Sequence, residues 1–208
     1  MENNQREHWD KIYSIKQAHE VSWTQEHPET SLAFLNSFAL NKNASIIDVG
    51  GGESKLVDFL LREGYTDLTV LDISEKALER TKARLGKSAE AVHWIVTDIT
   101  DFKPNRTYDV WHDRATFHFL TSEEQVNKYL HIASTCISDT GHMIIGTFSE
   151  NGPEKCSGLP IKQYSEANLT KLLSNGFKKI RCITEDHETP FHTTQNFLFC
   201  SFRRQRVK

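Results

Sequence analysis

The chain has 208 residues, 38% of them apolar and 25% charged, which is typical of one globular domain large enough to bury a core. Its net charge of −3 gives no electrostatic reason to expect binding to nucleic acid or to an anionic membrane. No apolar run approaches the roughly 20 residues of a membrane span, and no signal peptide is visible. The four cysteines lack CxxC spacing, which favours free thiols and a cytoplasmic protein.

Two helices are predicted first, over residues 5–16 and 29–40, the second with Thr30 or Ser31 as a candidate cap. From residue 45 onward strands and helices alternate, the pattern of a parallel sheet with helical crossovers. The predicted strands are 45–49, 68–72, 92–96, 108–112, 141–148, 178–188 and 193–204, and the later helices are 53–63, 74–85, 122–137 and 165–174. No helix separates the last two strands, so we expect them to pair antiparallel.

The segment SIIDVGGGESKLVDFLL, residues 45–61, combines a buried strand, a glycine turn and a helix. Such a junction presents bare backbone N–H groups and a helix N-terminus, which bind anionic or polar parts of a nucleotide-like ligand. A second strand, LTVLDIS, ends on Asp72, 22 residues after Gly50. A carboxylate at that spacing can accept hydrogen bonds from both hydroxyls of a ribose, so the two segments predict a nucleoside site.

Other nucleotide-binding motifs fit this turn poorly. The dinucleotide fingerprint requires a third glycine, and Lys55 stands at that position. A P-loop is absent because no Gly-Lys-Ser/Thr closes the turn. The acid before the glycines, Asp48, suits a ligand with a cationic end, such as an amino-acid moiety.

These residues resemble the class I S-adenosylmethionine-dependent methyltransferases, in which the first strand ends in an acid and a GxG turn and the second ends in an acid. The resemblance continues at VTDIT, where a third strand ends in Asp98 and Ile99, and at YDVWHDRATFHFL, residues 108–120. It implies an α/β, Rossmann-like three-layer sandwich with a seven-stranded, mostly parallel sheet. The implied strand order is 3-2-1-4-5-7-6, with strand 7 antiparallel.

The same resemblance implies roles for the strand-end residues. They are divided among the methionine, ribose and adenine parts of S-adenosylmethionine, and the product would be S-adenosylhomocysteine. Asp48, Gly50, Gly51 and Gly52 are expected at the methionine part, Asp72 and Ile73 at the ribose, and Asp98 and Ile99 at the adenine.

The end of the fourth predicted strand carries the candidate acceptor-side residues His112, Asp113, Arg114 and His118. Histidine and aspartate side chains commonly act as general bases, and an arginine can bind a carboxylate with two hydrogen bonds. The alternative is structural, with Asp113 paired to Arg114 and His118 packed on a helix. No metal site is predicted.

The N-terminal aromatics Trp9, Tyr13 and Trp23 precede the predicted core. In related methyltransferases an N-terminal helix covers the cofactor site, and an aromatic face there can stack on the adenosine or attract the sulfonium. We therefore expect a single domain, with residues 1–40 as a helical lid and 41–208 as the cofactor-binding core. The alternative is that this helix packs as ordinary core.

Two loops are expected near the same edge of the sheet. Residues 149–165 form a Gly- and Pro-containing insert with Cys156, and residues 184–197 form a hairpin turn with His187 and His192. The histidines are candidate substrate contacts. A metal site formed by both histidines and Cys156 is the less favoured alternative.

The sequence thus predicts transfer of a methyl group from S-adenosylmethionine to an acceptor. Little sequence lies beyond the predicted core, which favours a small molecule over a protein lysine or terminal amine. Two other classes stay open. One is a non-catalytic S-adenosylmethionine-binding regulatory module, and the other is a nicotinamide-dependent oxidoreductase.

Overall fold

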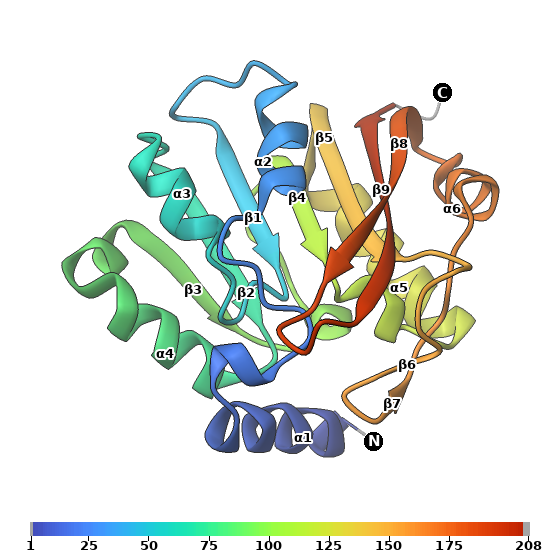
Figure 1. Cartoon of the computed structure of the whole chain (residues 1–208). Helices are drawn as coiled ribbons and strands as arrows, with labels where there is room; N and C mark the ends of the chain where they lie inside the picture. The colour runs from blue at the N-terminus through green and yellow to red at the C-terminus, as the bar shows by residue number, and fades with distance from the viewer. Residues whose placement is uncertain (1, 206–208) are drawn as a thin grey trace.

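The computed structural model describes residues 2–205, and Met1 and residues 206–208 lie outside the described part. Seven strands form one sheet in the order β3-β2-β1-β4-β5-β9-β8 (Figure 1). Their bounds are β1 Ser45–Val49, β2 Asp67–Asp72, β3 Val92–Val96, β4 Tyr108–Arg114, β5 Ile137–Phe148, β8 Phe177–Glu188 and β9 Thr194–Arg204. The two remaining strands, β6 Lys155–Cys156 and β7 Leu159–Pro160, form a small hairpin within the insert.

The pairing matches the predicted topology. Strands β1 to β5 are parallel to one another, and β9 runs antiparallel to both β5 and β8. Counted along the main sheet, β8 is the sixth strand and β9 the seventh, so the predicted order 3-2-1-4-5-7-6 is confirmed. The register sets Asp48 of β1 beside His112 of β4, which matters for the site below.

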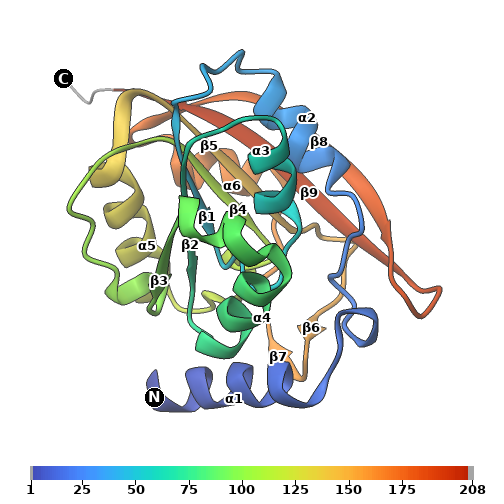
Figure 2. The ribbon, with the colours of Figure 1, turned by 90° about the vertical axis from the view of Figure 1, so that its left-hand side faces the viewer.

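Helices cover both faces of the sheet and complete the predicted three layers (Figure 2). One core contains apolar side chains of α2 Glu29–Asn36, α3 Leu56–Arg62 and α4 Glu75–Leu85. The other contains those of α5 Glu123–Cys136 and α6 Glu166–Leu173. Because β1 and β4 contribute side chains to both cores, they lie at the centre of the sandwich.

The second predicted helix is shorter than expected. Helix α2 ends at Asn36, and Ala39 has a φ of +50°, which no helix residue adopts. Neither candidate cap acts as one, because Pro28 occupies the N-cap position without a side-chain hydrogen bond. The hydroxyls have other partners instead, Glu185 for Thr30 and His112 for Ser31.

The expectation of four free thiols was wrong for two of the cysteines. Cys182 of β8 and Cys200 of β9 lie opposite each other in the antiparallel pair and form a disulfide. Cys136 and Cys156 are free and buried. Cross-strand partners depend on register, which cysteine spacing along the chain does not reveal.

Helix α1, Glu2–Ile15, crosses beneath the carboxyl ends of the parallel strands in both views (Figures 1 and 2). It is tied to the start of α4 through Asp10, whose Oδ1 accepts hydrogen bonds from the Ser74 hydroxyl at 2.6 Å and the Lys76 N–H at 3.3 Å. Among the described residues, no helix is long and apolar enough to cross a membrane.

Candidate active site

The glycine turn after β1 is shaped by close packing. Gly50 has a φ of +66°, and a Cβ there would lie 1.7 Å from the Thr116 hydroxyl oxygen, so only glycine fits. The N–H groups of Gly50 and Gly51 both donate to the Leu71 carbonyl, at 2.7 and 3.2 Å. The expectation of bare N–H groups was therefore wrong for these two residues. The turn contributes space for a ligand rather than free donors.

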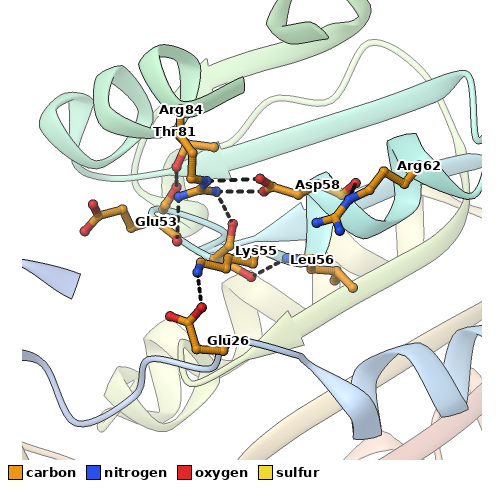
Figure 3. A network of polar contacts seen from close by, with 10 residues as sticks. Glu26, Glu53, Lys55, Leu56, Asp58, Arg62, Thr81 and Arg84 are labelled. Carbon is orange, nitrogen blue, oxygen red and sulfur yellow. Dashed lines mark hydrogen bonds and ion pairs between the residues drawn. The ribbon is translucent and has the colours of Figure 1, made fainter. Parts of the chain in front are cut away.

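A polar network holds the turn against α3 and α4 (Figure 3). Arg84 binds both carboxylate oxygens of Asp58, at 3.1 and 2.8 Å, and donates to the Glu53 and Ser54 carbonyls. Lys55 occupies the N-cap position of α3, and its ammonium pairs with Glu26 (Figure 3). Lys55 thus stands where a dinucleotide-binding turn has its third glycine, and its side chain is paired with Glu26.

One cavity of about 100 Å³ lies at the carboxyl ends of the strands. Six of the predicted cofactor residues line it: Trp23, Gly50, Asp72, Ile73, Asp98 and Ile99. Asp48, Gly51 and Gly52 lie outside its lining. The sequence analysis did not single out Gln5, Thr97, Thr116, Phe119 or Leu120, which also line it. The only sequence signal of the last four is that they lie near the quoted strand ends, and Gln5 of α1 had none.

Asp72 ends β2 at the cavity wall and is only 5% exposed. Its Oδ1 accepts the Ser74 N–H at 2.7 Å, and the Gly52 N–H also donates to the carboxylate. Burial raises the pKa of Asp72 to about 7, and the nearby carboxylates of Asp48 and Asp10 act in the same direction. A buried carboxylate with few donors is well suited to accept hydroxyl hydrogen bonds.

Asp98 and Ile99 follow β3 and start a short 3₁₀ helix, Ile99–Asp101. The Asp98 Oδ1 accepts the N–H and the hydroxyl of Thr100, both at 2.8 Å. Local bonding thus fixes one oxygen of the carboxylate at the cavity wall, beside the buried side chain of Ile99.

His112 is buried between strands and does not line the cavity. Its Nδ1 lies 2.7 Å from Asp48 Oδ1, and its Nε2 lies 2.9 Å from the hydroxyl of Ser31. Both ring nitrogens are therefore engaged, and the imidazole joins β4 to β1 and α2. The Asp48 carboxylate, predicted at the methionine part, lies in this buried pair.

Asp113 faces the opposite core and also lies outside the cavity lining. It accepts hydrogen bonds from the Tyr129 hydroxyl at 2.8 Å and from the N–H groups of Thr116 and Phe117 at 3.2 and 3.0 Å. Burial raises the pKa of Asp113 to about 6, while these donors oppose the rise. The carboxylate therefore organises the turn that follows β4.

His118 is fully buried and stacks on Phe148, with ring centroids 4.3 Å apart. Burial lowers the pKa of His118 to about 3, and the charge of Arg114 lowers it further, so the ring is neutral. Of the four acceptor-side candidates, only Arg114 lines the cavity. It donates to the Trp23 carbonyl at 2.9 Å and makes no ion pair with Asp113.

The N-terminal aromatics form the cavity's outer wall. Trp9 makes edge-to-face contacts with Trp23 and Phe119, at centroid distances of 5.7 and 5.1 Å. Tyr13 is 7% exposed, and its hydroxyl approaches Gly52. These contacts place α1 over the carboxyl ends of β1 and β2, where the sequence predicted a lid.

The two loops approach the same region. Cys156 of the insert lines the cavity, and burial raises the pKa of its thiol to about 11, so it stays protonated at neutral pH. In the hairpin, His187 Nε2 lies 2.7 Å from the Ser22 carbonyl oxygen, whereas His192 is exposed at the tip. Within residues 2–205, no group of three potential metal ligands is assembled.

Comparisons with known proteins agree with this geometry. Residues 46–141 match the family model described as a methyltransferase domain. The chain is 26% identical over 80 residues to nodulation protein S of Rhizobium fredii, covering 38% of the chain and 45% of that protein. It is 26% identical over 157 residues to EEF1A lysine methyltransferase 2 of Danio rerio, covering 67% and 66%. Alignments with four curated relatives span 37–66% of those proteins' lengths.

A solved structure shares the whole fold. It is the N-methyltransferase NodS from Bradyrhizobium japonicum WM9 in complex with S-adenosylhomocysteine, with a TM-score of 0.77 at 16% identity. The superposition covers 98% of this chain and 100% of that one. The family model over residues 46–141 and the confirmed strand order support a class I S-adenosylmethionine-dependent methyltransferase. The cofactor of this class is the S-adenosylmethionine that gives it its name.

Proposed function

We propose that this chain transfers a methyl group from S-adenosylmethionine to a small-molecule acceptor. One observation carries the proposal. Gly50 after β1, Asp72 at the end of β2 and Asp98 after β3 converge on a single cavity, although 48 residues separate the first from the last. The resemblance had assigned these three positions to one ligand, and their chemistry fits it, because the two carboxylates can accept hydrogen bonds from its hydroxyl and amino groups.

In this proposal Asp72 accepts hydrogen bonds from the ribose hydroxyls, Asp98 and Ile99 hold the adenine, and Gly50 leaves room for the methionine part. The bound cofactor supplies a methyl group activated by a sulfonium. The acceptor's lone pair bonds to the methyl carbon while the carbon–sulfur bond breaks and its electrons pass to sulfur, giving S-adenosylhomocysteine. The chain's main contribution is alignment of the two reactants.

The catalytic roles predicted for His112, Asp113 and His118 are replaced in this proposal by structural ones. None of the three lines the cavity, and the first two have their polar atoms engaged by buried partners. Among the described cavity-lining residues there is no histidine. In this proposal α1 lies over the bound cofactor and keeps water from the reactive sulfonium.

A small acceptor is favoured because side chains of α1, such as Trp9, and Cys156 of the insert both line the cavity and narrow the access to it. A protein lysine or terminal amine is the second candidate, and the likeness to EEF1A lysine methyltransferase 2 supports it. The two candidate acceptors differ in what must enter the cavity. A lysine side chain would have to reach the cavity from a folded protein, whereas a metabolite would be enclosed.

Thermal unfolding in the presence of S-adenosylmethionine, S-adenosylhomocysteine or NADH tests the cofactor. A ligand at a hundredfold excess over its dissociation constant stabilises the fold by about 2.7 kcal/mol if it binds only the folded state. We expect stabilisation by the first two ligands and none by NADH. Stabilisation by NADH alone would replace the proposal with an oxidoreductase. Release of S-adenosylhomocysteine on adding candidate acceptors then separates an enzyme from a regulatory module.

A further inference from the structure

Strand β8 forms one edge of the seven-stranded sheet, and β9 is its only strand neighbour within the described residues. An edge strand carries a row of backbone N–H and C=O groups without ladder partners, and a strand from another chain can pair with them. The opposite edge is β3, a strand of 5 residues, whereas β8 has 12. Figure 2 shows the turn between β8 and β9 extending beyond the helices at the right of the view. Of the two edges, β8 is therefore the better template for a further strand.

The large apolar side chains that the fold leaves exposed gather on this strand. Of the described residues, four such side chains are exposed, and three of them belong to β8 or to the turn that follows: Ile180, Ile183 and Phe191. Cys182 lies between the two isoleucines and is bonded to Cys200, so a disulfide holds this part of β8 against β9. The apolar side chains therefore stand on a fixed backbone, which lowers the entropic cost of pairing with another strand.

Charge on β8 is divided between the two halves of the strand. The basic side chains lie before Ile183 and the acidic ones after it: Lys178, Lys179 and Arg181, then Glu185, Asp186 and Glu188. Two copies of such a strand are complementary when they run antiparallel, because the basic half of each copy then lies beside the acidic half of the other. A parallel pair would set like charges together. The charge pattern therefore points to a second copy of this chain as the partner.

One register of this antiparallel pair fits the side chains best. When the pair is centred on Ile183, this residue faces its own counterpart, and Arg181 of each copy faces Glu185 of the other. Moving the centre by one residue sets Arg181 opposite His187 or Ile183 instead, and both ion pairs are lost. The register with β9 is irregular between Lys179 and Arg181, so regular pairing begins at Arg181. The central five residues, 181–185, therefore define the contact.

The two charged groups of this register have no ion pair of their own within residues 2–205. Arg181 is exposed and stacks on the ring of Phe34. Glu185 is half-buried and accepts the hydroxyl of Thr30, while the charge of Arg114 acts on it from beyond ion-pair distance. Each charge is thus held near the edge by a neutral contact, and an opposite charge from a second copy can approach it.

We propose that two copies of this chain pair through β8, antiparallel and centred on Ile183, so that their two sheets join into one. The contact is isologous, because each copy offers the same strand that it receives. A single strand pair buries little area, so we expect a weak dimer with a dissociation constant in the micromolar range. The inference does not depend on the proposed methyl transfer.

Sedimentation equilibrium of the full chain, from low micromolar to submillimolar concentrations, tests the pairing. We expect reversible association from the chain mass of 23.9 kDa to twice that mass. Ile183→Lys sets two like charges opposite each other at the centre and should weaken association about tenfold or more. Ile15→Lys is the matched control, because Ile15 is 65% exposed but lies on α1, and it should leave association unchanged. A single-chain mass at every concentration, or a dimer that Ile183→Lys leaves intact, overturns the inference.

Charge reversal tests the register. Arg181→Glu and Glu185→Lys should each weaken self-association about tenfold, because each sets like charges opposite each other twice. An equimolar mixture of the two variants should associate like the unaltered chain, since every facing pair in the mixed dimer again has opposite charges. Arg62→Glu is the control, because Arg62 also stacks on a phenylalanine but lies on α3.

Thermal unfolding of each variant alone shows whether it is folded. A mixture of two folded variants that stays as weak as either one overturns the inference. Should Glu185→Lys fail to fold, the comparison of Ile183→Lys and Arg181→Glu with their two controls decides, and unchanged association in both overturns it.

Discussion

The two halves of the cavity are built differently. In the half at the ends of β2 and β3, Asp72 and Asp98 each accept an N–H from the residue two positions further on, Ser74 and Thr100. The half at the end of β4 depends on contacts with distant segments, such as the Arg114 bond to Trp23, 91 residues away. Local geometry therefore defines the first half, and tertiary packing defines the second.

The first prediction concerns His112 and has the largest expected effect. His112→Ala leaves the Asp48 carboxylate buried without its partner, so we expect the free energy of unfolding to fall by about 3 kcal/mol. Urea unfolding measures it, with His93→Ala, an exposed histidine on β3, as the control that should change stability little. A fully stable His112→Ala protein that binds cofactor but has lost turnover would restore the catalytic role predicted from the sequence.

The second prediction concerns the ribose contact. Asp72→Ala removes the carboxylate at the end of β2, and we expect the affinity for S-adenosylhomocysteine to fall by about 2 kcal/mol, because the ribose hydroxyls lose a charged acceptor. Calorimetry measures it, and Asp67→Ala at the other end of the same strand is the control. Unchanged affinity would show that the ribose lies elsewhere.

The third prediction follows from the raised pKa of Asp72, about 7 in the protein without cofactor. The ionised carboxylate is the form that accepts two hydroxyl hydrogen bonds, and it is lost as the pH falls through 7. The affinity for S-adenosylhomocysteine should therefore drop about tenfold between pH 8 and pH 6. In Asp72→Asn this dependence should disappear, although Asp113, with a pKa of about 6, still titrates in that variant. Parallel pH profiles for the two proteins would contradict the assignment.

The smallest expected effect concerns the attachment of α1. Asp10→Ala removes the hydrogen bonds to Ser74 and Lys76 and should weaken S-adenosylhomocysteine binding by about 1 kcal/mol or less, mainly through faster dissociation. Stopped-flow displacement measures the dissociation rate. Glu75→Ala changes an exposed acid in the same helical turn and serves as the control. An unchanged rate in Asp10→Ala would mean that α1 does not retain the ligand.

This comparison explains what the sequence could and could not predict. Strand alternation and the final hairpin predicted the strands, the parallel sheet and its antiparallel last pair, because these are local patterns. The strand order itself was implied by the resemblance to class I methyltransferases, and the sheet confirms it. Asp72 and Asp98, which the strand ends and the resemblance had singled out, both line the cavity. His112 was read as facing an acceptor because it ends a strand, yet the face it occupies depends on Asp48 and Ser31, from segments 64 and 81 residues away.

The acceptor-side surroundings of Arg114 were beyond sequence reasoning as well. Phe197 belongs to a strand that pairs antiparallel with β5, so its place under the guanidinium depends on hairpin register. The Cys182–Cys200 disulfide depends on the same register. An arginine after the fourth strand suggested carboxylate binding, whereas its unpartnered edge could be seen only after folding.

Ser74 makes hydrogen bonds to three different residues at once. Its hydroxyl donates to Asp10 of α1 and accepts the Ala77 N–H that begins α4, while its own N–H donates to Asp72. The Ser74 hydroxyl therefore acts as a hydrogen-bond donor and as an acceptor at the same time. Only serine or threonine offers both, so an alanine would loosen the attachment of α1 and the start of α4, whereas its backbone N–H would still donate to Asp72. Position 74 should therefore tolerate few substitutions in a saturation library, although no substrate atom needs to touch it.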